Sequence, residues 1–247
     1  MKKLLTIMLC LILTISASTM FGCQKSIFDG NYTETSKTEV ATLASNIADA
    51  DGGEEMDYAQ GTKLSLNASI VNGEESLSLK MDIKTIAKDN DFKMEGSIDF
   101  SYPSQTVAGE LFYAEGCLYL NSNSGKIKQQ IDYNAFFDEY LNSTFAIPFA
   151  ISDLLGQLSL NPNVKCFVDD KTDVKKIKIE FESSTEGTGK AVFVYNAQYK
   201  LIALSYDISL EINTGDTSTK ISAGFSIEPW SGSISTPTDL DTYVFVE

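Results

Sequence analysis

Two residue types on which many enzymes depend are missing from this chain of 247 residues, which contains no histidine and no arginine. Without histidine it can form neither a Ser-His-Asp or Cys-His nucleophile pair nor an imidazole site for zinc. Without arginine it lacks the side chain that clamps phosphate or carboxylate groups through two parallel hydrogen bonds. Paired carboxylates could hydrolyse a glycoside, but Trp230 is the one tryptophan, and no G-x-S-x-G motif or glycine-rich phosphate loop is present. We therefore expect a protein that is not an enzyme and that uses no cofactor and no metal.

Positive charge is scarce as well, because 19 lysines face 34 acidic residues and the net charge is −15. An acidic surface repels phosphate backbones, so we expect no nucleic-acid partner. Anionic lipid headgroups would be repelled in the same way, which favours a body held away from a membrane surface by a tether. The acidic run from Asp49 to Glu55 lacks the spacing of a calcium-binding loop, so we interpret it as a solvated loop.

The apolar run at the N-terminus is too short to remain as a membrane span. It covers Leu4–Ile15, whereas a stable span requires roughly 20 apolar residues. Lys2 and Lys3 precede it, and a positive start followed by a short apolar stretch is typical of a signal peptide. We therefore predict that residues 1–22 direct export and are then removed.

The five residues that end at Cys23 resemble the lipobox at which bacterial lipoproteins are cut and acylated. Met20 and Gly22 fit that pattern, whereas Phe21 stands where the family has a small residue. The resemblance implies lipidation of Cys23, by chains such as palmitate, and two acyl chains are enough for stable anchoring. The alternative is an ordinary signal peptide cut near Ala17. The prediction is a lipid-anchored protein at the extracytoplasmic face of the cell membrane.

The remaining chain predicts a lipidated tether over residues 23–35 and one domain over residues 36–247. The domain is expected to open with a helix, because Ser36 and Glu39 have the spacing of a capping box. Apolar residues at helical spacing follow, namely Val40, Leu43, Ala44 and Ile47.

From Thr62 onward apolar residues recur at every second position, which predicts β-strands with one apolar face. Turn residues such as Asn72-Gly73 separate the runs and are typical of hairpins. The runs expected as strands are 64–70, 77–83, 92–100, 107–113, 117–121, 125–131, 164–168, 176–182, 191–195, 201–212 and 220–227. Such a series predicts one antiparallel sheet with one dry side.

A helical insertion interrupts the strands in the middle of the chain. Residues 133–141 have apolar side chains on one side of a helix, and Pro148 can open a second helix that continues to Leu158. A large sheet tends to curl, and its apolar side must be covered. We therefore predict an α+β, mainly β fold: a single curled antiparallel sheet, a half-barrel, with the N-terminal helix and the central insertion covering its concave face.

This order of elements resembles the half-barrel fold of LolA-like carriers and LppX/LprG-type bacterial lipoproteins. Residues 115–120 and 125–128 are similar to the hairpin that precedes the helical insertion in such proteins, and residues 235–241 are similar to their closing segment. The resemblance implies that lipid or a lipidated peptide is held in a hydrophobic cavity without catalysis. Any role that relatives give to arginine cannot be carried over, because this chain has none.

The resemblance implies a cavity whose lining comes from inward-facing residues of the strands and from a helical lid. Methionine and aromatic side chains adapt well to acyl chains. The residues expected to bind the ligand are Met81, Met94, Phe100, Leu204, Tyr206 and Phe225 on the strands and Phe136, Phe137 and Leu155 on the lid. The alternative for each residue is ordinary core packing, which any half-buried sheet needs.

Two questions stay open in the sequence. One is whether the domain binds a hydrophobic ligand or is instead an interaction or sensor module that meets an envelope protein through a polar face or a sheet edge. The other concerns Cys117 and Cys166, an even pair in an exported chain, which could form a disulfide or remain as two buried thiols.

Overall fold

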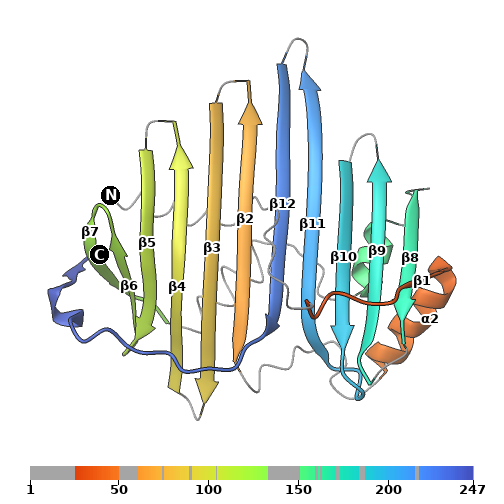
Figure 1. The fold of residues 1–247 in the computed structure, drawn as a ribbon, viewed down its shortest axis with the longest axis horizontal. Helices are drawn as coiled ribbons and strands as arrows, with labels where there is room; N and C mark the ends of the chain where they lie inside the picture. The colour runs from red at the N-terminus through yellow and green to blue at the C-terminus, as the bar shows by residue number, and fades with distance from the viewer. Residues whose placement is uncertain are drawn as a thin grey trace.

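The structure is a computed structural model, and a single sheet of 13 strands dominates it (Figure 1). The residues that it describes are 26–49, 61–73, 75–88, 91–103, 105–132, 151–158, 161, 163–170, 173–183, 187–214 and 217–246. The predicted signal peptide, Cys23, the acidic loop, Phe136 and Phe137 lie outside these residues.

Two meanders of antiparallel strands meet in the middle of the sheet, where β12 pairs with β2. The first meander is β2 (Thr62–Asn72), β3 (Glu75–Lys88), β4 (Asp91–Tyr102), β5 (Gln105–Ala114), β6 (Cys117–Ser122) and β7 (Gly125–Gln130). The second is β8 (Val164–Asp169), β9 (Lys175–Ser183), β10 (Gly187–Tyr195), β11 (Leu201–Thr214) and β12 (Thr217–Pro229). The predicted series of strands is therefore confirmed, and the chain crosses from one edge of the sheet to the other between β7 and β8.

Short strands from the two ends of the chain occupy the two edges of the sheet. β1 (Thr33–Thr35) pairs antiparallel with β8, and β13 (Val244–Phe245) pairs with β7 as the one parallel neighbour among the described strands. A very short edge strand limits pairing with other chains, because it offers few free backbone groups.

Local turn chemistry explains where the strands reverse. Gly73, with φ of 61°, turns β2 into β3, as the Asn-Gly signal predicts. Glu115 and Gly116 both have positive φ, 53° and 75°, which suits the two-residue turn between β5 and β6. Between β10 and β11 the Asn196 side chain accepts hydrogen bonds from the backbone N–H groups of Gln198 and Lys200, both at 3.0 Å. Each of these turns holds its two strands in register.

The predicted N-terminal helix is confirmed as α2 (Lys37–Ala48). Its capping box is formed, since the Glu39 N–H donates to Ser36 Oγ at 3.1 Å and the Ser36 N–H donates to Glu39 Oε2 at 3.0 Å. Val40, Ala44 and Ile47 are its buried residues. They join the same apolar cluster as the sheet, so α2 covers one sheet face.

Of the predicted central insertion, the described residues include one short helix. Among the described residues between β7 and β8, α5 (Ile151–Gln157) is the one helix, and it is seven residues long. It contacts α2 and buries Ile151 and Leu154 on the same sheet face, together with Leu158 just beyond its end. The structure therefore establishes a mainly β protein with one antiparallel sheet and an N-terminal helix, but not the predicted insertion of two helices.

The predicted tether needs a correction over its described part. Residues 26–35 do not extend freely, because β1 pairs with β8 and the preceding residues pack on the sheet. Ile27, Phe28 and Tyr32 lie against Val192, Val194 and Ala203. In Figure 1 this red segment crosses β10 and β9 on its way to β8. The N-terminal segment is thus part of the domain.

The two cysteines do not form a disulfide. Both Cys117 and Cys166 are free thiols. Cys166 lies on β8 near one edge of the sheet, and Cys117 lies on β6 near the other edge and on the opposite face. A disulfide requires Cα atoms within about 7 Å of each other, so this fold excludes an intramolecular bridge.

Candidate functional site

One face of the sheet, which we name the inner face, is continuously apolar. Residues that are paired across neighbouring strands lie on the same face, so the register defines rows of side chains. One row runs through Cys166, Ile179, Ala191, Tyr206, Phe225, Leu66, Met81 and Ile98. All of these residues are less than a tenth exposed and belong to one cluster with α2 and α5. The inner face is therefore the main core of the protein.

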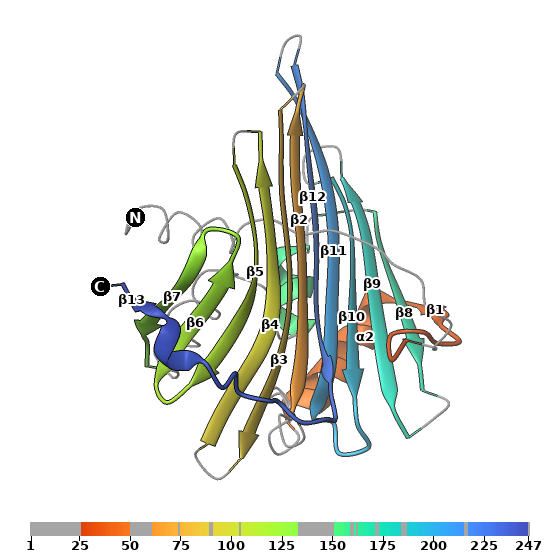
Figure 2. The ribbon, with the colours of Figure 1, turned by 60° about the vertical axis from the view of Figure 1, so that its left-hand side comes forward.

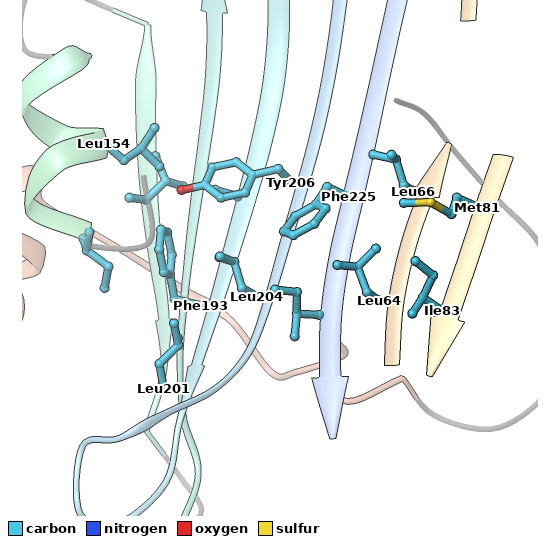
Figure 3. Close-up of a cluster of buried hydrophobic side chains, with 14 of the residues drawn as sticks. Leu64, Leu66, Met81, Ile83, Leu154, Phe193, Leu201, Leu204, Tyr206 and Phe225 are labelled. Carbon is cyan, nitrogen blue, oxygen red and sulfur yellow. The ribbon is translucent and has the colours of Figure 1, made fainter. Parts of the chain in front are cut away.

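The strand residues expected to bind a ligand all lie on this inner face. Their exposed fractions are 6% for Met81, 4% for Met94, 7% for Phe100, 0% for Leu204, 6% for Tyr206 and 4% for Phe225. Figure 3 shows several of them in line across the sheet, with Leu154 of α5 close to Tyr206. The rings of Phe193 and Tyr206 meet edge to face at 5.9 Å. The structure brings these residues together, as packed core side chains.

The one described member of the predicted lid is Leu155 on α5. It is half-buried and packs at the margin of the inner cluster. Leu154, its neighbour in the sequence, is 5% exposed and points into the cluster. α5 thus covers the sheet near β10 and β11, and Leu155 lies beside the contact that Leu154 makes.

The inner face does not stay covered along the whole length of its strands. Tyr102, Ile208 and Ile212 are 43%, 38% and 44% exposed, although alternation places them on the same face as the core. A half-buried row lies between them and consists of Leu210, Ile221, Ile70 and Leu77. We name these seven residues the open apolar end. It lies toward the upper ends of β2, β3, β4, β11 and β12 in Figure 1.

Sequence reasoning did not find the open apolar end, although the signal was present. Ile208, Leu210 and Ile212 continue the alternation of the longest apolar run without a break. Alternation indicates which face a residue occupies, but it does not indicate how far along the strand a helix reaches. Among the described residues, α2 and α5 are the α-helices that cover part of the inner face, and alternation does not encode their position.

The opposite face, the outer face, carries the charges. Ion pairs link neighbouring positions on it, including Lys63–Glu228 at 3.0 Å, Lys84–Glu95 at 2.9 Å, Lys178–Glu180 at 2.8 Å and Lys190–Asp207 at 3.8 Å. A row of hydroxyl side chains also crosses it, formed by Thr188, Ser209, Ser222, Ser69, Ser78, Ser101 and Thr106. This face is suited to water and to polar surfaces.

A hollow of about 1240 Å³ lies over β8–β12, and most of its lining residues hold outer-face positions. Lys165, Glu180, Lys190 and Asp207 follow one another in register across it. A smaller hollow of about 260 Å³ lies over β2–β5, lined among others by Asn67, Lys80 and Asp99. Both hollows combine charged and apolar lining residues, and the larger one is also lined by Ile208 of the open apolar end.

Two apolar islands interrupt the outer face, and an end of the chain covers each of them. The N-terminal segment covers Val192, Val194 and Ala203. At the other edge, Tyr243 is 5% exposed and packs against Tyr119, with the two rings edge to face at 5.2 Å. Figure 2 shows the blue C-terminal segment passing along the lower ends of the first meander to reach β7.

The pKa of the buried thiol on the inner face, Cys166, is set mainly by burial. Burial raises the pKa of the Cys166 thiol, and Lys37 offsets part of that effect. A raised thiol pKa keeps the sulfur protonated and unreactive. Among the described residues there is no group of three His, Cys, Asp or Glu side chains that could hold a metal ion. No helix in the described part of the chain has the length and hydrophobicity of a membrane span.

The structure is similar to LprF from Mycobacterium bovis, with 9% sequence identity and a TM-score of 0.36, over 80% of this chain and 97% of that chain. It also matches a DUF1329 family protein from Desulfovibrio piger, with 11% identity and a TM-score of 0.25, over 79% of this chain and 92% of that one. LprF belongs by name to the solved structures that the chain matches, and the LppX/LprG-type resemblance of the sequence stays a resemblance. At these TM-scores neither match carries an argument about a ligand. No protein-family model and no curated protein matches the chain.

Proposed function

We propose that this protein is an exported lipoprotein, anchored by acyl chains on Cys23 at the extracytoplasmic face of the membrane, whose inner face binds an apolar ligand. The ligand class is an acyl chain, either free or as part of a lipid. The open apolar end carries the proposal, because Tyr102, Ile208 and Ile212 expose apolar surface in continuity with the core.

Exposed apolar surface of this kind is costly unless something covers it. Each Å² of apolar surface removed from water stabilises a complex by about 25 cal/mol, and contiguous exposed patches on soluble domains mark binding sites. The open apolar end joins half-buried Leu77, Ile70 and Ile221 to the buried core. A linear hydrocarbon chain fits this arrangement, because it can lie along the strands without requiring a polar partner.

The inner-face core supports the same ligand class. Met81 lies at the middle of β3 and Met94 near the start of β4, both in the apolar cluster that continues into the open apolar end, and methionine can repack around an irregular apolar guest. In this proposal the sheet curls around the inner face as a half-barrel, and Phe136 and Phe137 act with Leu155 as a lid. In this proposal the protein holds its ligand without catalysis, and the row that would contact it first is Leu210, Ile221, Ile70 and Leu77.

Native mass spectrometry of the mature chain, starting at Gln24 and purified from an exporting host, tests this function. The purified protein, which lacks Cys23, must include residues 26–35, because β1 and the N-terminal segment are part of the fold. An additional mass of a fatty acid or phospholipid that disappears on delipidation is the expected result. A single apo mass, with no uptake of added fatty acid or phospholipid, would overturn the proposal.

A matched pair of variants locates the binding site. Ile208→Asp places a charge on the exposed inner face, and Ser209→Asp places the same charge one residue later on the outer face. Ile208→Asp should weaken the binding of a fluorescent fatty acid at least about tenfold, because a charge next to a hydrocarbon chain must be desolvated. Ser209→Asp should leave it unchanged. Equal affinities would place the ligand elsewhere.

The alternative is an envelope interaction module that meets a partner through the polar outer face or a sheet edge. β1 and β13 occupy the two edges with three and two residues, and strands this short offer few backbone groups to a partner. The exposed apolar residues of the open apolar end favour ligand binding, which is the function that we propose.

A further inference from the structure

The N-terminal segment of the domain, residues 26–35, packs on the outer face from Ile27 onward. The Ser26 N–H donates to Asp29 Oδ2 at 2.9 Å, and the Asp29 N–H donates to the Ser26 carbonyl at 3.0 Å. These two bonds close a turn at the start of the segment. Ile27 and Phe28 then contact the outer-face island of β10 and β11. The chain is thus held to the sheet from Ile27 and not first at α2.

Further contacts hold the rest of the segment in place. The Tyr32 hydroxyl donates to the Phe28 carbonyl at 2.7 Å, and the Asn31 N–H donates to Asp169 Oδ2 at 2.9 Å. Lys176 donates to the Asp29 carbonyl. The Lys178 ammonium lies over the Tyr32 ring, 5.1 Å from its centroid. Hydrogen bonds, apolar contacts and a cation–π contact therefore all act on the same face of the sheet.

The chain between Cys23 and Ser26 is very short. Gln24 and Lys25 are the two residues between them. Three fully extended residues span at most about 11 Å. A lipid attached to Cys23 would therefore lie within that reach of Ser26, whose neighbour Ile27 packs on the outer face.

We propose that the membrane that holds Cys23 lies against the outer face of β8–β11, and that the inner face, with its open apolar end, points away from the bilayer. This orientation rests on the lipid anchor of the proposed function. Its physical reason is the length of chain available, because a domain held about 11 Å from its lipid cannot turn its far side to the membrane.

The outer face should be repelled less by anionic lipid headgroups than the net charge of the whole chain suggests. The net charge of −15 would repel anionic headgroups, yet outer-face lysines and acids pair with one another, as Lys178–Glu180 and Lys190–Asp207 do. These ion pairs carry no net charge, and the hydroxyl row, which includes Ser209 and Ser222, can form hydrogen bonds with headgroups. Such a surface does not produce a strong electrostatic field of one sign. The expected repulsion therefore does not apply to this face.

The orientation deepens the proposed function, because it fixes where the ligand enters. With the inner face turned away from the bilayer, an acyl chain cannot reach the open apolar end by sliding out of the anchoring membrane. It must be delivered from the extracytoplasmic side. The ligand therefore enters from a carrier, a second membrane or free solution.

Depth-dependent quenching of the full lipidated protein tests the orientation. Ser209→Cys and Ile208→Cys place the same fluorescent label on adjacent residues of opposite faces, in a Cys117→Ser background so that Cys117 takes up no label. The proteins are reconstituted in phosphatidylcholine vesicles that contain a nitroxide-headgroup lipid. Quenching at residue 209 should exceed quenching at residue 208 several-fold. Equal quenching, or stronger quenching at residue 208, would overturn the proposal.

Two controls separate the causes of failure. A flexible Gly/Ser linker of about 20 residues, inserted before Ser26, spans roughly 25 Å and should abolish the difference between the two positions. The second pair, Asn213→Cys and Ile212→Cys, repeats the comparison if either first variant misfolds. Intact mass of Cys23 reports acylation separately. A missing acyl mass overturns the anchor and the orientation together, whereas an acylated protein that takes up no fatty acid overturns ligand binding alone.

Discussion

The inner and outer faces of the sheet are formed by alternate residues of the same strands, yet they differ in almost every physical property. Ile208 and Ser209 are neighbours in β11, and one lies on the apolar face while the other belongs to the hydroxyl row. The inner face is dry where α2 and α5 cover it and exposed at the open apolar end. The outer face is polar, except for two islands that the chain ends cover.

The two faces differ in whether an apolar side chain is buried by another part of the chain or exposed to solvent. Val192 and Val194 break the alternation of β10 by adding apolar residues to the outer face, and both are buried because Ile27 and Phe28 cover them. Ile208 and Ile212 keep the alternation and are nevertheless exposed. The irregular positions are covered by another part of the chain, and the regular ones extend beyond the buried core into solvent.

The largest stability effect is expected for Phe193→Ala on the inner face. Phe193 is fully buried and meets the Tyr206 ring, so its truncation leaves a cavity and should cost about 3–5 kcal/mol. Ser209→Ala on the outer face should stay within about 0.5 kcal/mol. Urea unfolding of the mature chain measures both. A loss below about 1 kcal/mol for Phe193→Ala would break the assignment of the inner face as the core.

A smaller but substantial effect is expected for Tyr243→Ala at the outer-face island of the C-terminal segment. The Tyr243 ring is 5% exposed and packs edge to face on Tyr119, so we expect a loss of about 2–3 kcal/mol. Val244→Ala is the matched control, because its side chain is 65% exposed and should change stability by less than about 0.5 kcal/mol. Equal effects in chemical denaturation would mean that the C-terminal segment does not stabilise the sheet.

The N-terminal segment offers a third comparison. Asp169 is 6% exposed and accepts the Asn31 N–H, so Asp169→Ala leaves a partly buried donor without its acceptor and should cost about 1–2 kcal/mol. Asp169→Asn keeps an oxygen at that position and should cost less. Thermal unfolding of both variants gives the difference. If the two substitutions cost the same, the bond to Asn31 does not hold the segment.

The smallest expected effect is a pH dependence at the same place. Burial, together with Asp169 and Asp29, raises the pKa of Tyr32 from 10 to about 12. The folded state therefore keeps a proton that the unfolded state releases, so this contribution is complete below pH 10 and is lost as the pH rises toward 12. Tyr32→Phe should reduce the alkaline loss of unfolding free energy relative to the unsubstituted protein. Identical pH profiles for the variant and the unsubstituted protein would contradict this account.

The sequence alone determined the strands, the capping box of α2 and the division of each strand into an apolar and a polar side. Those features depend on local physics: period-two alternation, Asn72-Gly73 and Glu115-Gly116 turns, and the reach of the Ser36 and Glu39 side chains. The same alternation placed Met81, Tyr206 and Phe225 on the inner face. The sequence could not separate core from cavity, because both require the same residues at the same spacing.

Tertiary structure decided what local patterns do not encode. The order of strands brought β12 against β2 and separated Cys117 from Cys166. An even number of cysteines therefore did not lead to a disulfide. Long-range contacts turned residues 26–35 from an expected tether into a packed segment, since Asp169 and Val192 are remote from it in the sequence. The packing of α2 and α5 on the inner face was likewise a tertiary outcome among the described residues. Each of these outcomes depends on residues far apart in the chain, and for that reason only the fold could decide them.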